Sequence, residues 1–524
     1  MHSSQYSQSF DPNSQPRGRG PGLGIVAAVI LVVAPQAPLG RLMFGMSPNF
    51  DATGVLGFPL IFAVVGAALL AFGVAASAMA RQVDHPGGLY SFVSRGLGRR
   101  AGLGAALVGL IGYSAMPVTF LVPIGDQASQ LLAKHTGVTL PWWLAAVPAV
   151  LAMGVLGTWR IRTIVRLLGG VLAGQLLLIA VFDVAALAKP GPEGLSTAAL
   201  SPSSLLSGGV GPALAFVLVG FVGFETVASY TGELRRSRPS ANRVAYLSVG
   251  LMAALYAFSC WALTVATGPS QVIEEAHTLR ITLVPSLIEA RLGPATAALY
   301  NSLVLVSVFA AALAFHNVAA RYLGALARDG VLPRALAPLD PHDGAPASCS
   351  GVQIGVTLAL VLVTGVSGAD PTATLFLWMS DIGTLGICFV LILAALAIVA
   401  FFLRSDAEEW GFLGWEGPVV AAVFSVVTLT LLVVLALTQF EVRLAVPSDS
   451  PLGYLPPALL VLLFVAGMVW ATVLRTARPQ IFVRIGRSQP VGPGESTART
   501  VVPDIAAVGQ TGARNEPLPH RHRK

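Results

Sequence analysis

Apolar stretches of membrane-spanning length recur along almost the whole of this 524-residue chain. Crossing the hydrocarbon core of a bilayer takes roughly 20 residues of helix, and twelve stretches approach or exceed that length. They are residues 23–46, 57–80, 100–123, 142–157, 164–188, 208–230, 244–267, 296–320, 351–367, 373–403, 416–439 and 453–474. Only 11% of the residues are charged, and the mean hydropathy is +0.74. The sequence therefore predicts an all-α membrane protein with twelve transmembrane helices.

Polar tails flank the apolar region. Residues 1–20 lack an apolar core, which argues against a cleavable signal peptide, and we expect a flexible tail there. Residues 476–524 are rich in Arg, Pro, Gly and Thr, which is typical of a basic disordered tail. The transmembrane domain is therefore expected over residues 21–475.

Arginines gather in alternate connections between the spans. They follow the second, fourth and sixth spans, at Arg81, Arg95, Arg99, Arg100, Arg160, Arg162, Arg235, Arg236, Arg238 and Arg243. By the positive-inside rule these loops and both termini face the cytoplasm, with the chain in the cytoplasmic membrane. The net charge of +7 thus reflects topology, and no nucleic-acid partner is expected. Because the three cysteines show no paired spacing, the sequence predicts no metal site, cofactor or disulfide framework.

Two of the predicted spans are interrupted, and they lie five spans apart. The first contains VVAPQAPLG (Val32 to Gly40) and the sixth contains GFVGFE (Gly220 to Glu225). Proline cannot donate the helical hydrogen bond, so two prolines three residues apart predict local unwinding. Irregular backbone at membrane depth occurs where it lines a cavity or is buried in protein. Matched interruptions in two halves of a chain indicate the binding site of a transporter.

Opposite orientations follow for the two broken spans, since the first runs outward and the sixth inward. The half-helix after each break then begins near the midplane and directs its positive end there, which favours an anionic group such as a carboxylate. Glu225 lies in the first turn of the inner half-helix. An acid inside a span is a functional candidate, and the alternative is that Glu225 holds neighbouring helices together. Tyr113 in the third span either faces the same place or packs between helices.

Four stretches resemble the amino acid-polyamine-organocation (APC) permease superfamily. They are the proline-containing break of the first span, HPGGLYSFVSRGLG (His85 to Gly98), GFVGFETVASYTGELRRSRPSANRVAYLSVG (Gly220 to Gly250) and NVAARYLGALARDGVLPRALAPLDPHDGAP (Asn317 to Pro346). The resemblance implies the LeuT-type fold, a 5+5 inverted repeat with discontinuous helices 1 and 6. The repeats would cover about residues 21–190 and 205–405, with peripheral helices 11 and 12 at about 415–475.

The resemblance also implies that the chain moves amino acids or related amines by alternating access, with the substrate between the two breaks. Carried over residue by residue, the substrate-binding candidates are Ala34, Gln36, Ala37, Leu39, Gly40, Phe221, Val222, Gly223 and Phe224, to which Tyr113 and Glu225 are added. Many members have a Gly/Ser-rich first break that offers backbone N–H groups. Pro35 and Pro38 offer none, and Gln36 can supply a side-chain donor instead.

Other polar groups fall inside or near the predicted spans. Isolated charges at such depth pair or face water, so Arg41, one turn past the first break, and Asp381 in the tenth span are predicted to form an outer gate pair. Asp183 is interpreted as an interfacial residue near the outer end of the fifth span. His316 is expected to serve helix packing.

Several alternatives stay open. Proton symport and substrate exchange both fit, so a coupling proton is a possible partner beside the small-molecule substrate and the lipid bilayer. A non-transporting amino acid sensor on the same fold is the alternative function, although the basic tail is too short for an output domain. An enzyme is not expected, since the sequence has no nucleophile, metal-ligand or phosphate-loop pattern.

Overall fold

A computed structural model of the chain describes residues 24–80, 88–159, 161–229, 237–337, 347–404, 416–438 and 450–486, together with 440, 444 and 446. Contacts divide the chain into a compact unit, Met1–Arg487, and a second unit, Ser488–Lys524. The second unit and the predicted tail at 1–20 lie outside the described residues. Every helix of the described residues belongs to the first unit.

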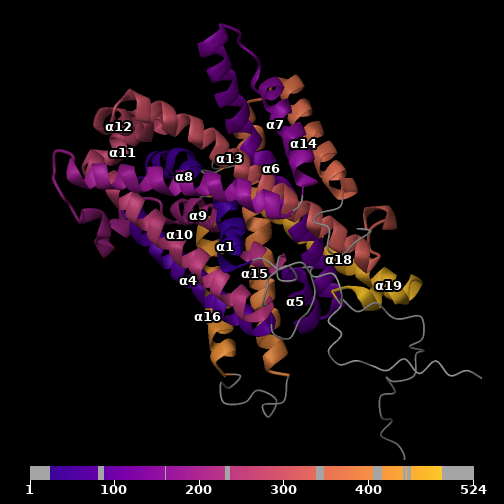
Figure 1. The fold of residues 1–524 in the computed structure, drawn as a ribbon. Helices are drawn as coiled ribbons and strands as arrows, with labels where there is room; N and C mark the ends of the chain where they lie inside the picture. The colour runs from indigo at the N-terminus through magenta and orange to yellow at the C-terminus, as the bar shows by residue number, and fades with distance from the viewer. Residues whose placement is uncertain are drawn as a thin grey trace, which may run out of the picture. The chain divides into compact units, whose positions relative to one another are not determined.

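Helices make up the regular structure of the described residues, and no strand occurs among them (Figure 1). In the first half these are α1 (Ile25–Val33), α2 (Pro38–Arg41), α3 (Ser47–Thr53), α4 (Phe58–Ala80), α5 (Leu89–Gly96), α6 (Arg99–Thr136), α7 (Trp142–Gly157) and α8 (Ile161–Ala188). In the second half they are α9 (Val210–Phe221), α10 (Ser237–Thr267), α11 (Val272–Leu279), α12 (Leu283–Leu292), α13 (Pro294–Asp329), α14 (Ala347–Ser367), α15 (Leu377–Phe402), α16 (Glu416–Leu437), α18 (Leu455–Ala477) and α19 (Pro479–Arg484).

Short 3-10 and π segments join or interrupt these helices. The 3-10 turns are η1 (Ala34–Gln36), η3 (Ala198–Leu200), η4 (Pro202–Leu206), η5 (Phe224–Ser229), η7 (Arg280–Thr282), η8 (Arg334–Leu336) and η11 (Pro451–Tyr454). The π segments η2 (Leu42–Met46) and η9 (Thr372–Phe376) join α2 to α3 and lead into α15. Interruptions of this kind inside helices commonly mark functional positions.

Eleven helical stretches of the described chain are long and apolar enough to cross a membrane. The fourth predicted span corresponds to α7, an apolar helix of 16 residues, which is shorter than the others. The third and eighth spans are longer than predicted, because α6 has 38 residues and α13 has 36. Hydropathy finds the apolar window of a helix, whereas a helix continues wherever its backbone bonds and packing allow.

The long helices pack around one extensive hydrophobic core. In that core α6 contacts α13, α15 and α18, while α4 packs against α10 and α16. The pair α7 and α14 lies side by side at one edge (Figure 1). Both the 3-10 turn η1 and the short helix α2 contact α13, so the interrupted part of the first span lies within this core.

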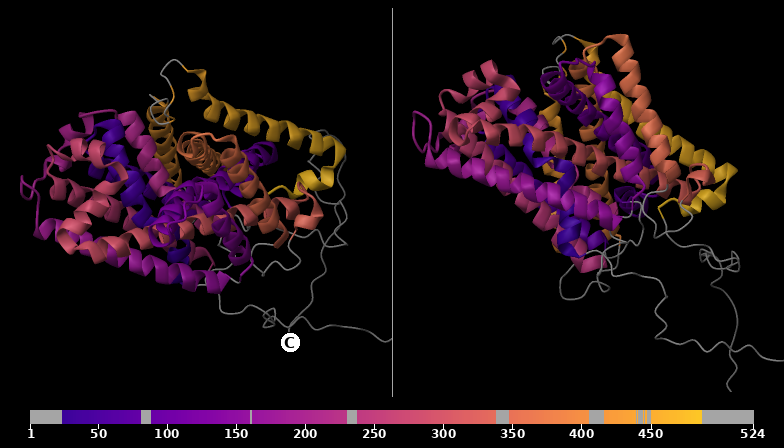
Figure 2. Two further views of the ribbon diagram at one scale, coloured as in Figure 1. Left: turned by 90° about the horizontal axis from the view of Figure 1, so that it is seen from above. Right: turned by 45° about the horizontal axis from the view of Figure 1, so that its top comes forward.

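Helices α16 and α18 expose apolar side chains along one face, and α18 runs along the margin of the bundle (Figure 2). In α16 the exposed residues are Val420, Val423, Phe424, Val427, Leu431 and Val434, and in α18 they include Val461, Leu462, Val465, Val469 and Val473. Water would oppose such a surface, whereas lipid tails cover it without cost. The chain is therefore a multi-pass membrane protein.

Order continues beyond the predicted domain boundary at residue 475. The short helix α19 follows α18, and the Gly486 N–H donates to Asp329 Oδ2 at 3.0 Å. The same oxygen accepts the Tyr90 hydroxyl at 2.9 Å. Ile485 is fully buried, which explains why this part of a basic segment docks on the ends of α5 and α13.

Candidate functional site

The first break lies between α1 and α2. After α1 ends at Val33, residues Ala34–Gln36 form a 3-10 turn, and Ala37 adopts a left-handed conformation with φ 44° and ψ 66°. A left-handed residue with a Cβ costs roughly 1–2 kcal/mol. Pro38 then begins α2, where its missing N–H is no loss. The two prolines thus produce the predicted discontinuity in the first span.

The second break follows α9. Val222 is extended, with φ −56° and ψ 129°, and Gly223 has φ 117°, a conformation that favours glycine. Phe224–Ser229 continues as a 3-10 helix with Glu225 in its first turn. The sixth span is therefore also discontinuous, and Glu225 lies where the sequence predicts it.

The two breaks touch each other. A Cβ built on Gly223 would lie 2.9 Å from Pro35 Cβ, and 3.6 Å from the Phe315 ring of α13. Only a glycine allows this approach, because real Cβ contacts are longer than 3.0 Å. Segments that are distant in sequence and predicted to form one site are thus in direct contact.

Glu225 is buried beside this contact, with 2% of its surface exposed. The Tyr113 hydroxyl of α6 donates to Glu225 Oε1 at 3.1 Å, and the Gly223 N–H donates to Oε2 at 3.0 Å. A carboxylate has about four lone-pair positions, so two donors leave acceptor capacity. Three of the predicted site residues therefore meet in one hydrogen-bonded group.

Gln36 is buried in the first break, and its side-chain amide bonds to the preceding helix. Its side-chain Nε2 donates to the Val32 carbonyl at 3.2 Å, whereas Oε1 has no hydrogen-bond partner. The main-chain carbonyl of Gln36 accepts the Tyr256 hydroxyl of α10 at 3.1 Å. The Val32 carbonyl thus takes one of the two amide hydrogens, and a side-chain donor from Gln36 to the substrate stays a prediction.

Leu39 and Gly40 face α8 and α13. The Leu39 N–H lies 3.5 Å from Gln175 Oε1, which also accepts the Ser307 hydroxyl at 2.7 Å. A Cβ on Gly40 would lie 2.7 Å from Val308 Cγ1. These contacts join the first break to both helices. Gln175 is not among the residues predicted from the sequence, although a lone glutamine in an apolar run is a visible signal.

All eleven predicted substrate-binding residues are buried: Ala34, Gln36, Ala37, Leu39, Gly40, Tyr113, Phe221, Val222, Gly223, Phe224 and Glu225. The phenylalanines pack outward from the second break. The Phe221 ring lies 6.2 Å from Phe62 and 6.2 Å from Tyr256, and the Phe224 ring lies 6.1 Å from Phe72. Access to these residues from either side requires helices to move.

Arg41 turns toward the second break. A Cβ on Gly220, in the last turn of α9, would lie 3.3 Å from Arg41 Nε and 3.5 Å from the Phe62 ring. The guanidinium also interacts electrostatically with Tyr256. Asp381 is buried in α15. The outer gate pair of Arg41 and Asp381 stays a prediction.

Asp183 and His316 are both buried between helices. Asp183 Oδ2 accepts the Ser259 hydroxyl of α10 at 2.7 Å, and the residue is only 3% exposed. Its interpretation as a residue at membrane-interface depth stays a prediction, and the structure adds that α10 covers this face of α8. His316 Nε2 lies 2.7 Å from the Ser350 hydroxyl of α14, which agrees with a packing role.

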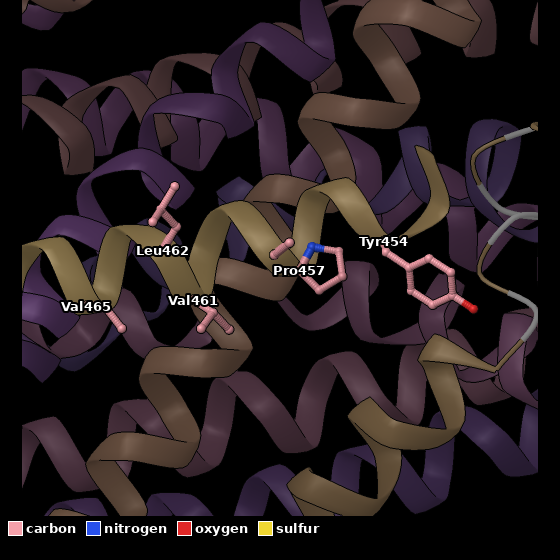
Figure 3. A pocket seen from close by; sticks show the side chains of 6 residues that line it. Tyr454, Pro457, Val461, Leu462 and Val465 are labelled. Carbon is pink, nitrogen blue, oxygen red and sulfur yellow. The ribbon is translucent and has the colours of Figure 1, made fainter. Parts of the chain in front are cut away.

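A shallow apolar groove runs along the outside of α18. Figure 3 shows the side chains of Tyr454, Pro457, Val461, Leu462 and Val465 along it, with Ala458 completing the lining. It contains none of the predicted site residues, and it belongs to the apolar outer face. In the described part of the chain, no three His, Cys, Asp or Glu side chains are grouped to hold a metal ion.

Curated relatives of the chain are transporters of unestablished specificity. An uncharacterized transporter of Mycobacterium tuberculosis is 24% identical over 366 residues, covering 69% of this chain and 78% of the relative. An uncharacterized transporter of Mycobacterium bovis matches to the same extent, with the same identity and coverage.

Solved structures of a similar fold include the Eremococcus coleocola manganese transporter in two variant forms. They are 15% identical to this chain, cover 88% of it and 94% of their own length, and give TM-scores of 0.51 and 0.53. Identity this low shows the fold alone, which is the APC/LeuT-like transporter fold.

A family model covers nearly the whole transmembrane region. The amino acid permease model matches residues 23–471, which include both breaks and every predicted site residue. The chain therefore belongs to the amino acid permease family of the APC superfamily, and it is a membrane transporter.

Proposed function

We propose that this transporter carries amino acids or related amines across the cytoplasmic membrane by alternating access, with the substrate between the two breaks. The observation that carries the proposal is the contact between Pro35 and Gly223 with the Glu225 carboxylate beside it. Unwound backbone in a bilayer costs several kcal/mol for each unsatisfied polar group. Two such breaks in contact are explained by a ligand that uses their free backbone and side-chain groups.

The finer architecture belongs to the same proposal. Twelve spans result when α7 is counted with the eleven longer stretches. A 5+5 inverted repeat would relate the first broken span to the sixth, and the arginine-rich loops favour an orientation with both termini in the cytoplasm. Because every candidate residue is buried, transport requires the helices around the breaks to open alternately to the two sides.

Glu225 supplies the chemistry for an amine. Its two donors, the Tyr113 hydroxyl and the Gly223 N–H, hold the carboxylate in place, and the bare Oε1 of Gln36 adds a second buried acceptor. A substrate ammonium would satisfy both. Proton symport or exchange would supply the driving force.

Two other functions are weaker. A sensor without transport has no output domain in the described chain. Manganese, named for the structurally similar transporter, would need a cluster of ligands, and the described residues offer none near the breaks.

Uptake into proteoliposomes tests the proposal. Purified protein should accumulate or exchange at least one labelled compound from a panel of amino acids and amines, under imposed proton or sodium gradients. Glu225→Gln and Gln36→Ala should reduce this uptake while expression and folding stay unchanged. Folded protein that neither takes up nor exchanges any compound of the panel would refute the proposal.

A further inference from the structure

Starting from the proposed function, we infer that Arg41 binds the carboxylate of the substrate, because the first break offers few backbone N–H groups for that task. The substrate would then be a zwitterionic amino acid, held by Glu225 at its ammonium and by Arg41 at its carboxylate. An amine without a carboxylate would lose half of this recognition.

Backbone donors are scarce in the first break. Pro35 and Pro38 have no N–H, and the Ala37 N–H donates to the Ala34 carbonyl at 3.2 Å. The Leu39 N–H faces Gln175 Oε1 at 3.5 Å. A carboxylate placed here would find few free donors, and a buried carboxylate without donors is strongly disfavoured.

Two glycines leave room for the Arg41 side chain. A Cβ on Gly45 would collide with Arg41 Cδ, and a Cβ on Gly220 would lie 3.3 Å from Nε. Gly220 precedes Gly223 by about one helical turn, so the guanidinium lies next to the second break. Arg41 is also partly exposed, although Gly40 and Leu42 on either side of it are buried. The Nε atom itself is buried beside Gly220, so a ligand reaches the guanidinium only when the surrounding helices move.

The surroundings of the guanidinium suit an anion. Phe62, Phe221 and Tyr256 pack their rings around this region with centroid distances of 5.4–6.2 Å. Arginine binds a carboxylate through two parallel hydrogen bonds, which strengthen where apolar groups exclude water. The Tyr256 hydroxyl links the two features, because it donates to the Gln36 carbonyl and interacts with Arg41.

Charge balance supports the same assignment. Arg41 and Glu225 border the same break from two different spans, and they carry opposite charges. A zwitterion placed between them would meet an opposite charge at each end, whereas a simple cation would meet one only at Glu225. The predicted pair of Arg41 with Asp381 is a separate hypothesis, and a charge-swapped variant distinguishes the two.

The experiment compares amino acids with the amines that result from removing their carboxyl groups. Proteoliposome uptake is measured for L-leucine and isoamylamine, L-phenylalanine and phenethylamine, and L-lysine and cadaverine. In Arg41→Gln, KM for the transported amino acid should rise about 30-fold or more, the usual consequence of removing one partner of a buried charge pair. In the same variant, the KM for the matching amine, or the constant for its inhibition of amino acid uptake, should change less than about threefold.

Two further variants serve as controls. Arg41→Lys keeps the charge but loses the fork-shaped donor set, so it should raise KM selectively for the amino acid, by less than Arg41→Gln does. Arg291→Gln removes an arginine that donates to the main-chain carbonyls of Ala266 and Lys189, remote from the breaks. This variant should leave the ratio of the KM for the amino acid to the KM for the amine unchanged.

The charge-swapped variant Arg41→Asp with Asp381→Arg separates anchor from gate. It keeps opposite charges at the two positions but leaves no arginine at position 41, so amino acid uptake should stay impaired. Restored uptake, or an equal change for amino acid and amine in Arg41→Gln, would overturn the assignment. If Arg41→Gln does not fold, the same comparison of KM for amino acid and amine is made in Arg41→Lys. Wild-type protein that moves none of the six compounds would instead refute the proposed function.

Discussion

Replacing Gly223 by alanine should force apart the two breaks. At φ 117° a residue with a Cβ is strained by about 1–3 kcal/mol. The new methyl group would also lie 2.9 Å from Pro35 Cβ, closer than carbon atoms pack, and overpacking typically costs about 1–3 kcal/mol. Together these effects predict destabilisation by about 2–6 kcal/mol.

Thermal unfolding of detergent-solubilised protein measures this loss, and two glycines provide matched controls. Gly54 has φ 63°, and a Cβ added there would have no atom within 4 Å, so Gly54→Ala carries a milder backbone strain without the steric clash. Gly174 lies inside α8 with open space around it, so Gly174→Ala should be neutral or slightly stabilising.

The midpoint of thermal unfolding should be highest for Gly174→Ala, intermediate for Gly54→Ala and lowest for Gly223→Ala. Transport should be lost only in Gly223→Ala. A Gly223→Ala protein that unfolds at the midpoint of Gly54→Ala and retains transport would show that the breaks do not need their contact. The two breaks would then not form one site in the way proposed.

Three other predictions concern separate contacts. Ser270 donates to Glu193 from its hydroxyl at 2.7 Å and its N–H at 3.0 Å, and these bonds lower the pKa of the Glu193 carboxyl. The contact therefore stabilises the fold at pH values above the ordinary glutamate pKa of about 4.3. This stabilisation is lost as the pH falls through the lowered pKa of the folded protein. The protection of the Ser270 amide against hydrogen exchange, followed over pH, measures this, and Ser270→Ala, which loses the hydroxyl donor but keeps the N–H donor, should reduce the dependence. Gly486→Val should release α19, because its Cβ would meet the Ser94 side chain at 2.6 Å; trypsin should then cut the segment faster, whereas Gly194→Val, with positive φ but open space, should not change cleavage. Tyr113→Phe removes one donor of the site carboxylate and should weaken substrate affinity about tenfold, as expected for a hydrogen bond to a charged group; unchanged affinity would place the substrate elsewhere.

Sequence reasoning located both breaks because proline and glycine act locally. Pro35 and Pro38 remove helical donors wherever they occur, and Gly223 permits a φ that few other residues adopt. The contact of Tyr113 with Glu225 was also within reach, since a buried acid needs a donor and few polar groups occur at that depth.

Tertiary partners were out of reach for the same kind of reasoning. Gln175 is visible as a lone polar residue, but only the packing of α8 against α2 and α13 shows that it takes the Leu39 N–H. The burial of Asp183 was not predictable either, because hydropathy gives depth along a span and not which face a neighbouring helix covers. The Gln36 amide donates to the carbonyl of Val32, four residues earlier in α1, a bond that the sequence pattern alone does not reveal.

The central claim is that the two breaks form the substrate site of a transporter. Equilibrium binding of a labelled substrate to purified wild-type protein and to Glu225→Gln tests it most directly, once uptake has identified that substrate. Asp183→Asn is the matched control, because Asp183 is a buried acid that accepts the Ser259 hydroxyl instead of a group of either break. The account predicts that Glu225→Gln weakens binding at least about tenfold while Asp183→Asn binds like the wild type. Equal affinity in wild type and Glu225→Gln, with both proteins folded, would contradict it.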